Sequence, residues 1–229
     1  MVSPVRGYSP LTSLILYDMA IFSGGALHGK VGNLVYYMRN GVSCVRSIPK
    51  PRNDSPSPAQ QAQRARMKLA TQFLAPLKPV LDDTFKPGNR KKLSGLNWAT
   101  KQLLQDAIAG EYPDLYVRAE RVLMSCGTLP PLRKTALALG EDGLFAFNWE
   151  PTGSPFIDNN VPVYLLVYNQ THRRVVLSKK AACRGDGELT LQIAQEMLKG
   201  TVHCYGFVMD RMRRSASDSV FLGTLVDGV

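Results

Sequence analysis

The stretch that decides the fold of the N-terminal part spans residues 29–49. It reads Gly-Lys-Val-Gly-Asn-Leu-Val-Tyr-Tyr-Met-Arg-Asn-Gly-Val-Ser-Cys-Val-Arg-Ser-Ile-Pro. The runs Val31 to Met38 and Val42 to Ile48 are rich in β-branched and aromatic residues, and Asn40-Gly41 between them favours the positive φ of a tight turn. The sequence therefore predicts a β-hairpin. Because an isolated hairpin is marginal in water, we expect it to pack against the rest of the chain or another subunit.

Two helices are predicted after the hairpin. Ser57 is a natural N-cap, Pro58 suits the first helical position, and Gln60 completes a capping box for a helix that runs to Phe73. Its alanine-rich stripe would let another backbone approach closely. A second helix is expected over residues 96–109, because its apolar residues recur at helical spacing and a glycine follows as the stop.

The pattern of apolar residues changes from Leu115 onward. Short Val-, Leu-, Tyr- and Phe-rich runs alternate with turn residues at intervals of about 8–14 residues, which is typical of an antiparallel sandwich or barrel. One run carries apolar residues on both faces, namely Tyr164, Leu166 and Tyr168 on one and Val163, Leu165 and Val167 on the other. We therefore expect this strand to be central and covered on both sides. The predicted strands are 116–125, 134–139, 144–149, 161–168, 174–178, 188–193, 202–208 and 217–222.

These patterns predict an α+β protein in two parts. Residues 19–110 form a basic module made of a β-hairpin and two helices. Residues 111–229 form an antiparallel β-sandwich of the immunoglobulin or fibronectin type. Residues 1–18 are interpreted as a loose tail or a non-native extension, because Met19 begins a natural second start.

Positive charge is concentrated in one segment. Of the 28 Lys and Arg residues in the chain, 14 lie between Lys30 and Lys101, against three Asp or Glu there, a balance of +11. Such an excess favours phosphates, an acidic protein surface or anionic lipid headgroups, although a solvated basic face would give the same pattern. The candidate polyanion or partner surface comprises Lys30, Arg39, Arg46, Lys50, Arg52, Arg64, Lys68, Arg90, Lys91 and Lys92.

The cysteines and the hydropathy pattern indicate the cellular location that we expect. The four cysteines are too sparse for a disulfide scaffold and lack zinc spacing, so free thiols in a reducing compartment are expected. No run of 18 or more apolar residues predicts a membrane span, and no secretory signal is recognised. A cytoplasmic or virion-associated location is therefore preferred.

No chemical motif predicts catalysis, a cofactor or a metal. Gly24 to Lys30 has the spacing of a phosphate-binding loop, but the required hydroxyl residue is replaced by Val31 and a strand follows where a helix is needed. His28, His172 and His203 lack partners at metal-binding spacing and are interpreted as structural. The acidic pairs at 82–83 and 141–142 are read as helix-end or loop residues. The integrin-type tripeptide at 184–186 is explained by turn geometry.

Several of these motifs resemble a known family. The pattern Gly29-Lys30-Val31-Gly32, then Tyr37 and Gly41, then Val45-Arg46 and Pro49, and finally Pro58-Ala59-Gln60 with Gln63-Arg64 is similar to an uncharacterised family of Bacteroidota genomes and their phages. In that family a β-rich tail carries a Trp and a Val-x-Val-x-x-Tyr-Asn-like strand, which correspond to Trp149 and residues 163–169 here. The resemblance implies a source context and no catalytic residues.

Two functions follow from these observations. The first is a non-enzymatic structural or interaction protein, such as a phage or prophage component, that assembles with itself or a protein partner through its N-terminal module. The second is nonspecific nucleic-acid binding by the basic segment 30–101. No helix-turn-helix, zinc-finger or RNA-recognition signature predicts sequence-specific reading, and no small-molecule substrate is inferred.

Overall fold

The chain divides into two compact units, Met1–Ser55 and Pro56–Val229. The structure, a computed structural model, describes residues 20–23, 25–39, 41–50, 55–85, 94–152, 154, 157–178, 182–212 and 214–226. The predicted tail at residues 1–18 lies outside this description.

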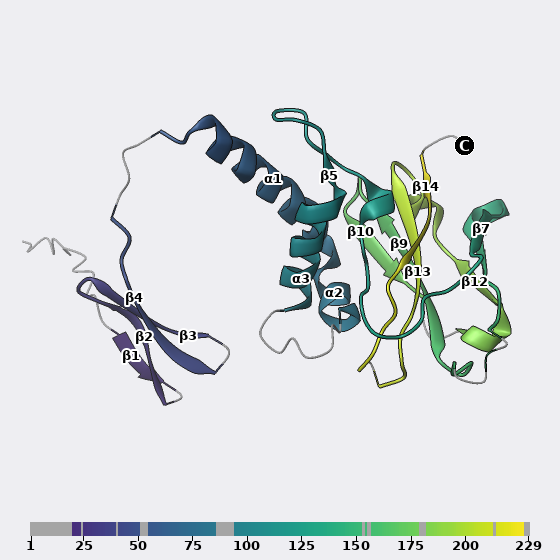
Figure 1. The fold of residues 1–229 in the computed structure, drawn as a ribbon, viewed down its shortest axis with the longest axis horizontal. Helices are drawn as coiled ribbons and strands as arrows, with labels where there is room; N and C mark the ends of the chain where they lie inside the picture. Colours follow the sequence, from purple (N-terminus) through teal and green to yellow (C-terminus); the bar gives the residue numbers. More distant parts are fainter. Residues whose placement is uncertain are drawn as a thin grey trace, which may run out of the picture. The chain divides into compact units, whose positions relative to one another are not determined.

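The described part of the first unit is an antiparallel sheet of four consecutive strands (Figure 1). The strands are β1 (Ala20–Ser23), β2 (Ala26–Val31), β3 (Leu34–Arg39) and β4 (Val42–Ser47). The predicted hairpin corresponds to β3 and β4, and Gly41 at its turn has a φ of +78°. Strands β1 and β2 were not predicted, because residues 20–31 are rich in glycine. The sequence feature that could have predicted these two strands is the Gly24-Gly25 pair, because Gly-Gly is favoured in two-residue hairpin turns.

The second unit begins with helices, and its first helix starts where the sequence predicts. Helix α1 (Pro58–Leu74) has the complete capping box: the Gln60 amide donates to Ser57 Oγ at 3.4 Å, and the Ser57 amide donates to Gln60 Oε1 at 3.3 Å. A 3-10 turn (Ala75–Leu77) leads into α2 (Lys78–Thr84). Helix α3 (Gly95–Gln102), capped by Ser94, continues as a π-helical segment (Leu103–Ala107), so the second predicted helix is formed by two helix types.

Two antiparallel sheets make up most of the rest of this unit. The larger has the order β10-β9-β13-β14, with β11 also pairing with β9, and the smaller has the order β12-β8-β7. The pair β5 (Ile108–Ala109) and β6 (Tyr116–Val117) stands apart from both. The strands of the two sheets are β7 (Ala136–Leu139), β8 (Leu144–Asn148), β9 (Pro162–Asn169), β10 (Arg174–Leu177), β11 (Ala182–Cys183), β12 (Glu188–Gln192), β13 (Val202–Val208) and β14 (Val220–Leu225).

Strand β9 is buried along its whole length, as its two-sided apolar pattern predicts. Val163, Leu165 and Val167 lie in one core with residues of β8 and β12, so this core fills the space between the two sheets. The opposite face of the larger sheet lies in a second core with the helices, which cover it in Figure 1. The unit therefore has three layers, with the larger sheet in the middle.

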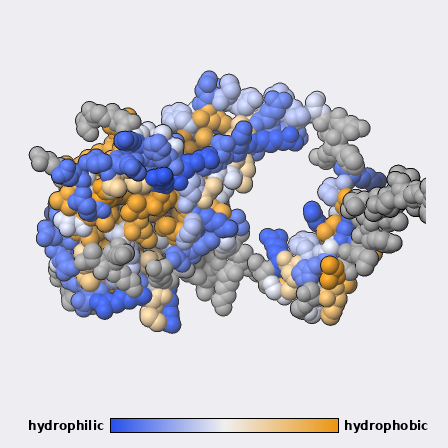
Figure 2. Space-filling model, turned by 180° about the vertical axis from the view of Figure 1, so that it is seen from behind, coloured by the Kyte–Doolittle hydropathy of each residue, from blue (hydrophilic) through white to orange (hydrophobic). Residues whose placement is uncertain are grey.

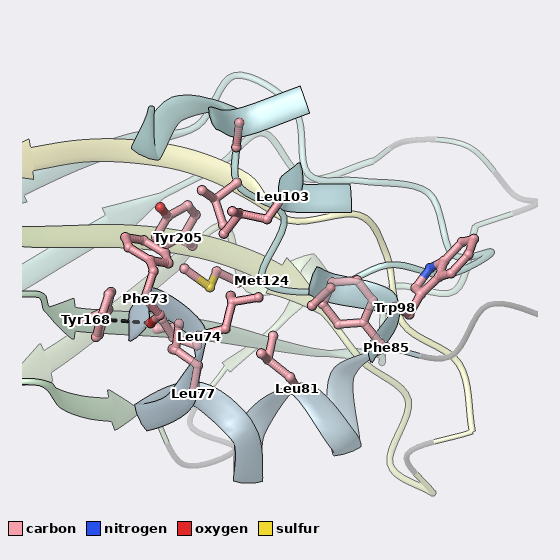
Figure 3. Packing of buried hydrophobic residues seen from close by; sticks show 14 of the residues in the cluster. Phe73, Leu74, Leu77, Leu81, Phe85, Trp98, Leu103, Met124, Tyr168 and Tyr205 are labelled. Carbon is pink, nitrogen blue, oxygen red and sulfur yellow. Dashed lines mark hydrogen bonds between the residues drawn. The ribbon is translucent and has the colours of Figure 1, made fainter. Parts of the chain in front are cut away.

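The helical core is lined by aromatic and leucine side chains. Phe73, Leu74, Leu77 and Leu81 come from the helices, and they lie in one cluster with Tyr168, Tyr205 and Met124 (Figure 3). The Tyr168 hydroxyl donates to the Phe73 carbonyl at 3.0 Å, and the Tyr205 hydroxyl donates to the Ala119 carbonyl at 2.9 Å. These bonds satisfy two buried hydroxyl groups and join the sheet to the segments that cover it.

The boundary between the units differs from the predicted one. The helices were expected to share a module with the hairpin over 19–110, but they pack on the larger sheet, and the division falls between Ser55 and Pro56. The reason is the apolar outer face of β9 and β13, which the smaller sheet cannot cover because it lies on the other side.

A buried histidine lies at the edge of the helical core. His203 on β13 is 5% exposed, and its ring contacts those of Phe73 and Tyr168. Its Nε2 lies 2.8 Å from Gln170 Oε1, and its Nδ1 lies 2.8 Å from Thr224 Oγ1. The amide oxygen can only accept, so Nε2 carries the proton and the Thr224 hydroxyl donates to Nδ1. Burial lowers the pKa of this imidazole, and the charge of Glu120 opposes the effect.

We expect Gly206→Ala to destabilise the second unit by about 1–3 kcal/mol, because overpacking a core forces side chains off their rotamers. A Cβ at Gly206 would overlap with Phe147 Cζ. Urea unfolding followed by tryptophan fluorescence measures the change, since both tryptophans belong to this unit. Gly140→Ala is the control, because its Cβ would meet the Leu144 carbonyl oxygen at an ordinary 3.4 Å. Equal stability of the two variants would contradict the prediction.

We expect the second unit to lose stability as the pH falls from about 7.5 to about 5.5. The pKa of His203 is lowered in the folded state, so below the unfolded-state pKa of about 6.5 the unfolded chain takes up a proton that the folded chain resists. In urea titrations at several pH values, His203→Gln should flatten this dependence. His172→Gln, at an exposed position, should keep it. A pH dependence that survives His203→Gln would show that another group is responsible.

Candidate interaction surface

The register of the four-stranded sheet places its residues on two faces of different character. Opposed residues in an antiparallel ladder point to the same side, and neighbours along a strand point to opposite sides. Phe22 lies opposite Leu27, Gly29 opposite Tyr36, and Tyr36 opposite Val45. The face that these pairs define, called here the apolar face, carries no charged side chain. Its described members are Phe22, Leu27, Gly29, Val31, Leu34, Tyr36, Met38, Ser43, Val45 and Ser47.

The other side of the sheet, called here the basic face, carries all the charges of the four strands. Lys30 lies opposite Val35, and Val35 lies opposite Arg46. Arg39 follows on the same side of β3, opposite Val42. The described residues 20–50 contain no aspartate or glutamate. The described members of the basic face are Ile21, His28, Lys30, Val35, Tyr37, Arg39, Val42, Cys44 and Arg46.

Side-chain contacts agree with this division. On the apolar face, the Ser43 hydroxyl lies 3.4 Å from Met38 Sδ. On the basic face, the guanidinium carbon of Arg46 lies 6.0 Å from the centroid of the Tyr37 ring, within reach of a cation–π interaction. Val35, Tyr37 and Arg46 line a shallow hollow there. The basic face thus combines cations with an aromatic ring.

The sheet buries very little of itself. None of the residues 20–50 whose exposure the structure describes is buried. Figure 2, where this unit lies at the right, shows hydrophobic and hydrophilic residues side by side on its surface. Large apolar side chains are exposed on both faces: Ile21 66%, Phe22 71%, Leu27 42%, Val31 47%, Leu34 41%, Met38 39%, Val42 62% and Val45 53%. Exposed apolar surface of this kind marks interaction sites.

The structure brings together three of the ten predicted basic residues. Lys30, Arg39 and Arg46 share the basic face, and Lys50 follows β4. Arg64 and Lys68 are exposed on α1, which belongs to the other unit. Four candidates lie outside the described residues: Arg52, Arg90, Lys91 and Lys92.

The apolar face is not among the surfaces that the sequence predicts. Its signal was the period-2 alternation of Leu34, Tyr36 and Met38 with their neighbours, and of Val45 between polar residues. The sequence predicts the hairpin of β3 and β4. Two strands without β1 and β2 make a face too narrow to suggest an interaction surface.

The tripeptide Arg184-Gly185-Asp186 is engaged within the fold. Arg184 is 3% exposed, and its guanidinium donates to the Pro130 carbonyl. Burial lowers the pKa of Arg184. The Asp186 carboxylate accepts from the Cys183 amide at 2.7 Å in a 3-10 turn (Arg184–Asp186). Local geometry therefore accounts for this motif.

Other candidate groups in the second unit also have structural partners. Burial raises the pKa of the Cys204 thiol to about 12, which keeps it protonated at neutral pH. Asp82 accepts from the Leu96 amide at 3.2 Å and so joins α2 to the start of α3. Within the described residues, no group of three or more His, Cys, Asp or Glu side chains is placed to hold a metal ion. The helices described there are too short or too polar to cross a membrane.

Comparison with known proteins assigns the chain to a family. No curated protein matches the chain. Among solved structures, it is similar to the fn3 domain of the human collagen alpha-1(XX) chain, with 15% identity over 44% of this chain and 89% of that one, at a TM-score of 0.30. A family model matches residues 25–223, from the turn before β2 into β14. The chain therefore belongs to DUF6266, a family of unknown function.

Proposed function

We propose that this protein is a non-enzymatic interaction or structural protein that binds a protein partner or another copy of itself through its N-terminal sheet. The observation that carries the proposal is the sheet's exposure: eight large apolar side chains of β1–β4 are at least 39% exposed. Folding such a sheet gains little unless a second layer covers it.

The second unit would serve as the scaffold. Its cores are closed, with β9 buried on both faces. We propose that β7–β14 form a sandwich of the fibronectin type: β7, β8 and β12 would be strands A, B and E of one sheet, and β9, β13 and β14 strands C, F and G of the other. The source in Bacteroidota or their phages, which the sequence resemblance implies, and a role as a phage or prophage component stay predictions.

We expect a photo-crosslinker on the sheet to capture a protein. A benzophenone amino acid placed at Tyr36 in the full chain, expressed in its source cells, should give discrete protein adducts, identified by mass spectrometry, with itself or another protein. The matched control is Tyr116 on β6, which is 56% exposed in the second unit and should give none.

A second probe is placed at Tyr37, on the opposite face of β3. Absence of adducts from both Tyr36 and Tyr37 would overturn the interaction function. Equal labelling from Tyr116 would also count against it, because the sheet would then have no preference over the rest of the surface.

A second candidate function is nonspecific binding of nucleic acid by the basic face. The observation that favours it is the grouping of Lys30, Arg39 and Arg46 beside Tyr37 on one side of the sheet. Phosphate-neutralising cations with an interleaved aromatic ring are the usual features of single-stranded nucleic-acid grooves.

For this second function, we expect Arg39→Gln with Arg46→Gln to weaken binding to single-stranded DNA about tenfold. The slope of log affinity against log salt should fall by about 1.4, because each lost phosphate contact contributes about 0.7. The control is Arg64→Gln with Lys68→Gln, two exposed cations on α1. Fluorescence anisotropy over a salt series measures both. An equal loss in the control pair would assign the affinity to overall charge, and the basic face would not be the site.

A further inference from the structure

We propose that the partner of the apolar face is the apolar face of a second copy of this chain, so that two four-stranded sheets pack face to face. The inference rests on the proposed function, because it names the partner of that same sheet. In this dimer a second copy covers the apolar face, and the basic face takes no part in the contact.

Charge favours this pairing. The apolar face has no charged side chain, and the cations of the strands, Lys30, Arg39 and Arg46, all lie on the opposite side. Contact through the apolar faces would therefore place the two sets of cations on the two outer surfaces, far apart and in water. Contact through the basic faces would bring like charges together without any acidic residue of the sheet to pair them.

The same absence of charge argues for a second copy over a different protein. Specific recognition of a foreign partner generally uses complementary charges or buried polar groups, which fix orientation and exclude wrong partners. The apolar face offers only Ser43, Ser47 and the Tyr36 hydroxyl for that purpose. A twofold contact between two copies needs fewer such polar groups, because the two surfaces are identical. Each contact between two residues then occurs twice, once on each side of the symmetry axis.

The size of the face sets the expected strength. Six residues at about 3.4 Å and four strands at about 4.8 Å give a face of roughly 20 Å by 19 Å, or about 400 Å² in projection. A standard stable interface buries about 800 Å² per partner, so this contact is at the weak end. Gly29, opposite Tyr36, has no side chain, so a facing sheet can approach the backbone closely at this position. We therefore expect a reversible dimer whose population depends on concentration.

The test uses a matched pair of substitutions in the full chain. Val45 on the apolar face and Val42 on the basic face belong to the same strand and are 53% and 62% exposed. Sedimentation velocity from about 1 μM to about 1 mM gives the dimer dissociation constant of each. Val45→Glu should raise it at least tenfold, because a charge buried without a partner is costly. Val42→Glu should change it by less than twofold.

Salt and a second pair of variants keep the test independent of any folding defect. The dimer should persist from about 0.1 M to about 1 M salt, since screening does not weaken apolar contact. Tyr36 and Tyr37 are half-buried neighbours on opposite faces of β3. In Tyr36→Trp the emission of the new tryptophan should shift to shorter wavelength as the concentration rises, and in Tyr37→Trp it should not.

The outcomes separate this inference from the function on which it rests. A chain that is monomeric at every concentration overturns the second copy as partner, and the photo-crosslinking experiment then decides whether the sheet binds a different protein. A dimer weakened equally by both glutamates, or by neither, places the contact elsewhere and overturns the inference. A dimer lost only with Val45→Glu supports it.

Discussion

The structure of the second unit depends on the burial of both faces of β9 and β13. A strand whose two faces are apolar can be stable only in the middle of three layers, since each exposed face would cost the free energy of its apolar area in water. The smaller sheet supplies one layer and the helices supply the other. The hydroxyls of Tyr168 and Tyr205 then fix the helical layer in place, because a carbonyl within reach satisfies each of them.

The strands of the first unit also alternate between two faces, but no second layer covers either face within the described residues of that unit. Its strands place apolar and basic residues on opposite faces, and no described residue of the sheet is buried. A sheet of this kind would gain stability from the layer that the proposed partner supplies, and its folding and binding would then be coupled. This coupling makes the sheet the natural place to look for the activity of the protein, whereas the second unit is closed by its own side chains.

Much of the fold could be predicted from local sequence. Three features depend only on residues that are close in the sequence, and their residue types predict them: the capping box at Ser57, the hairpin at Gly41 and the two-sided strand at 163–168. The boundary between the units could not be predicted, because it depends on which layer covers β9. That layer is fixed by contacts such as the one between Tyr168 and Phe73, which are 95 positions apart. The candidate surface was predicted in part: its cations were identified, but their grouping on one face required the register of all four strands.

The two-faced sheet also carries a constraint on how this family can change. In each strand the apolar and basic surfaces differ by a single step along the chain, as Tyr36 and Tyr37 do on β3. A substitution alters one position on one surface, but inserting or deleting one residue within a strand would exchange the faces for every residue beyond it in that strand. Length variation among relatives should therefore be confined to the turns, such as the one at Gly32-Asn33, while the strands keep their length even where their residues differ.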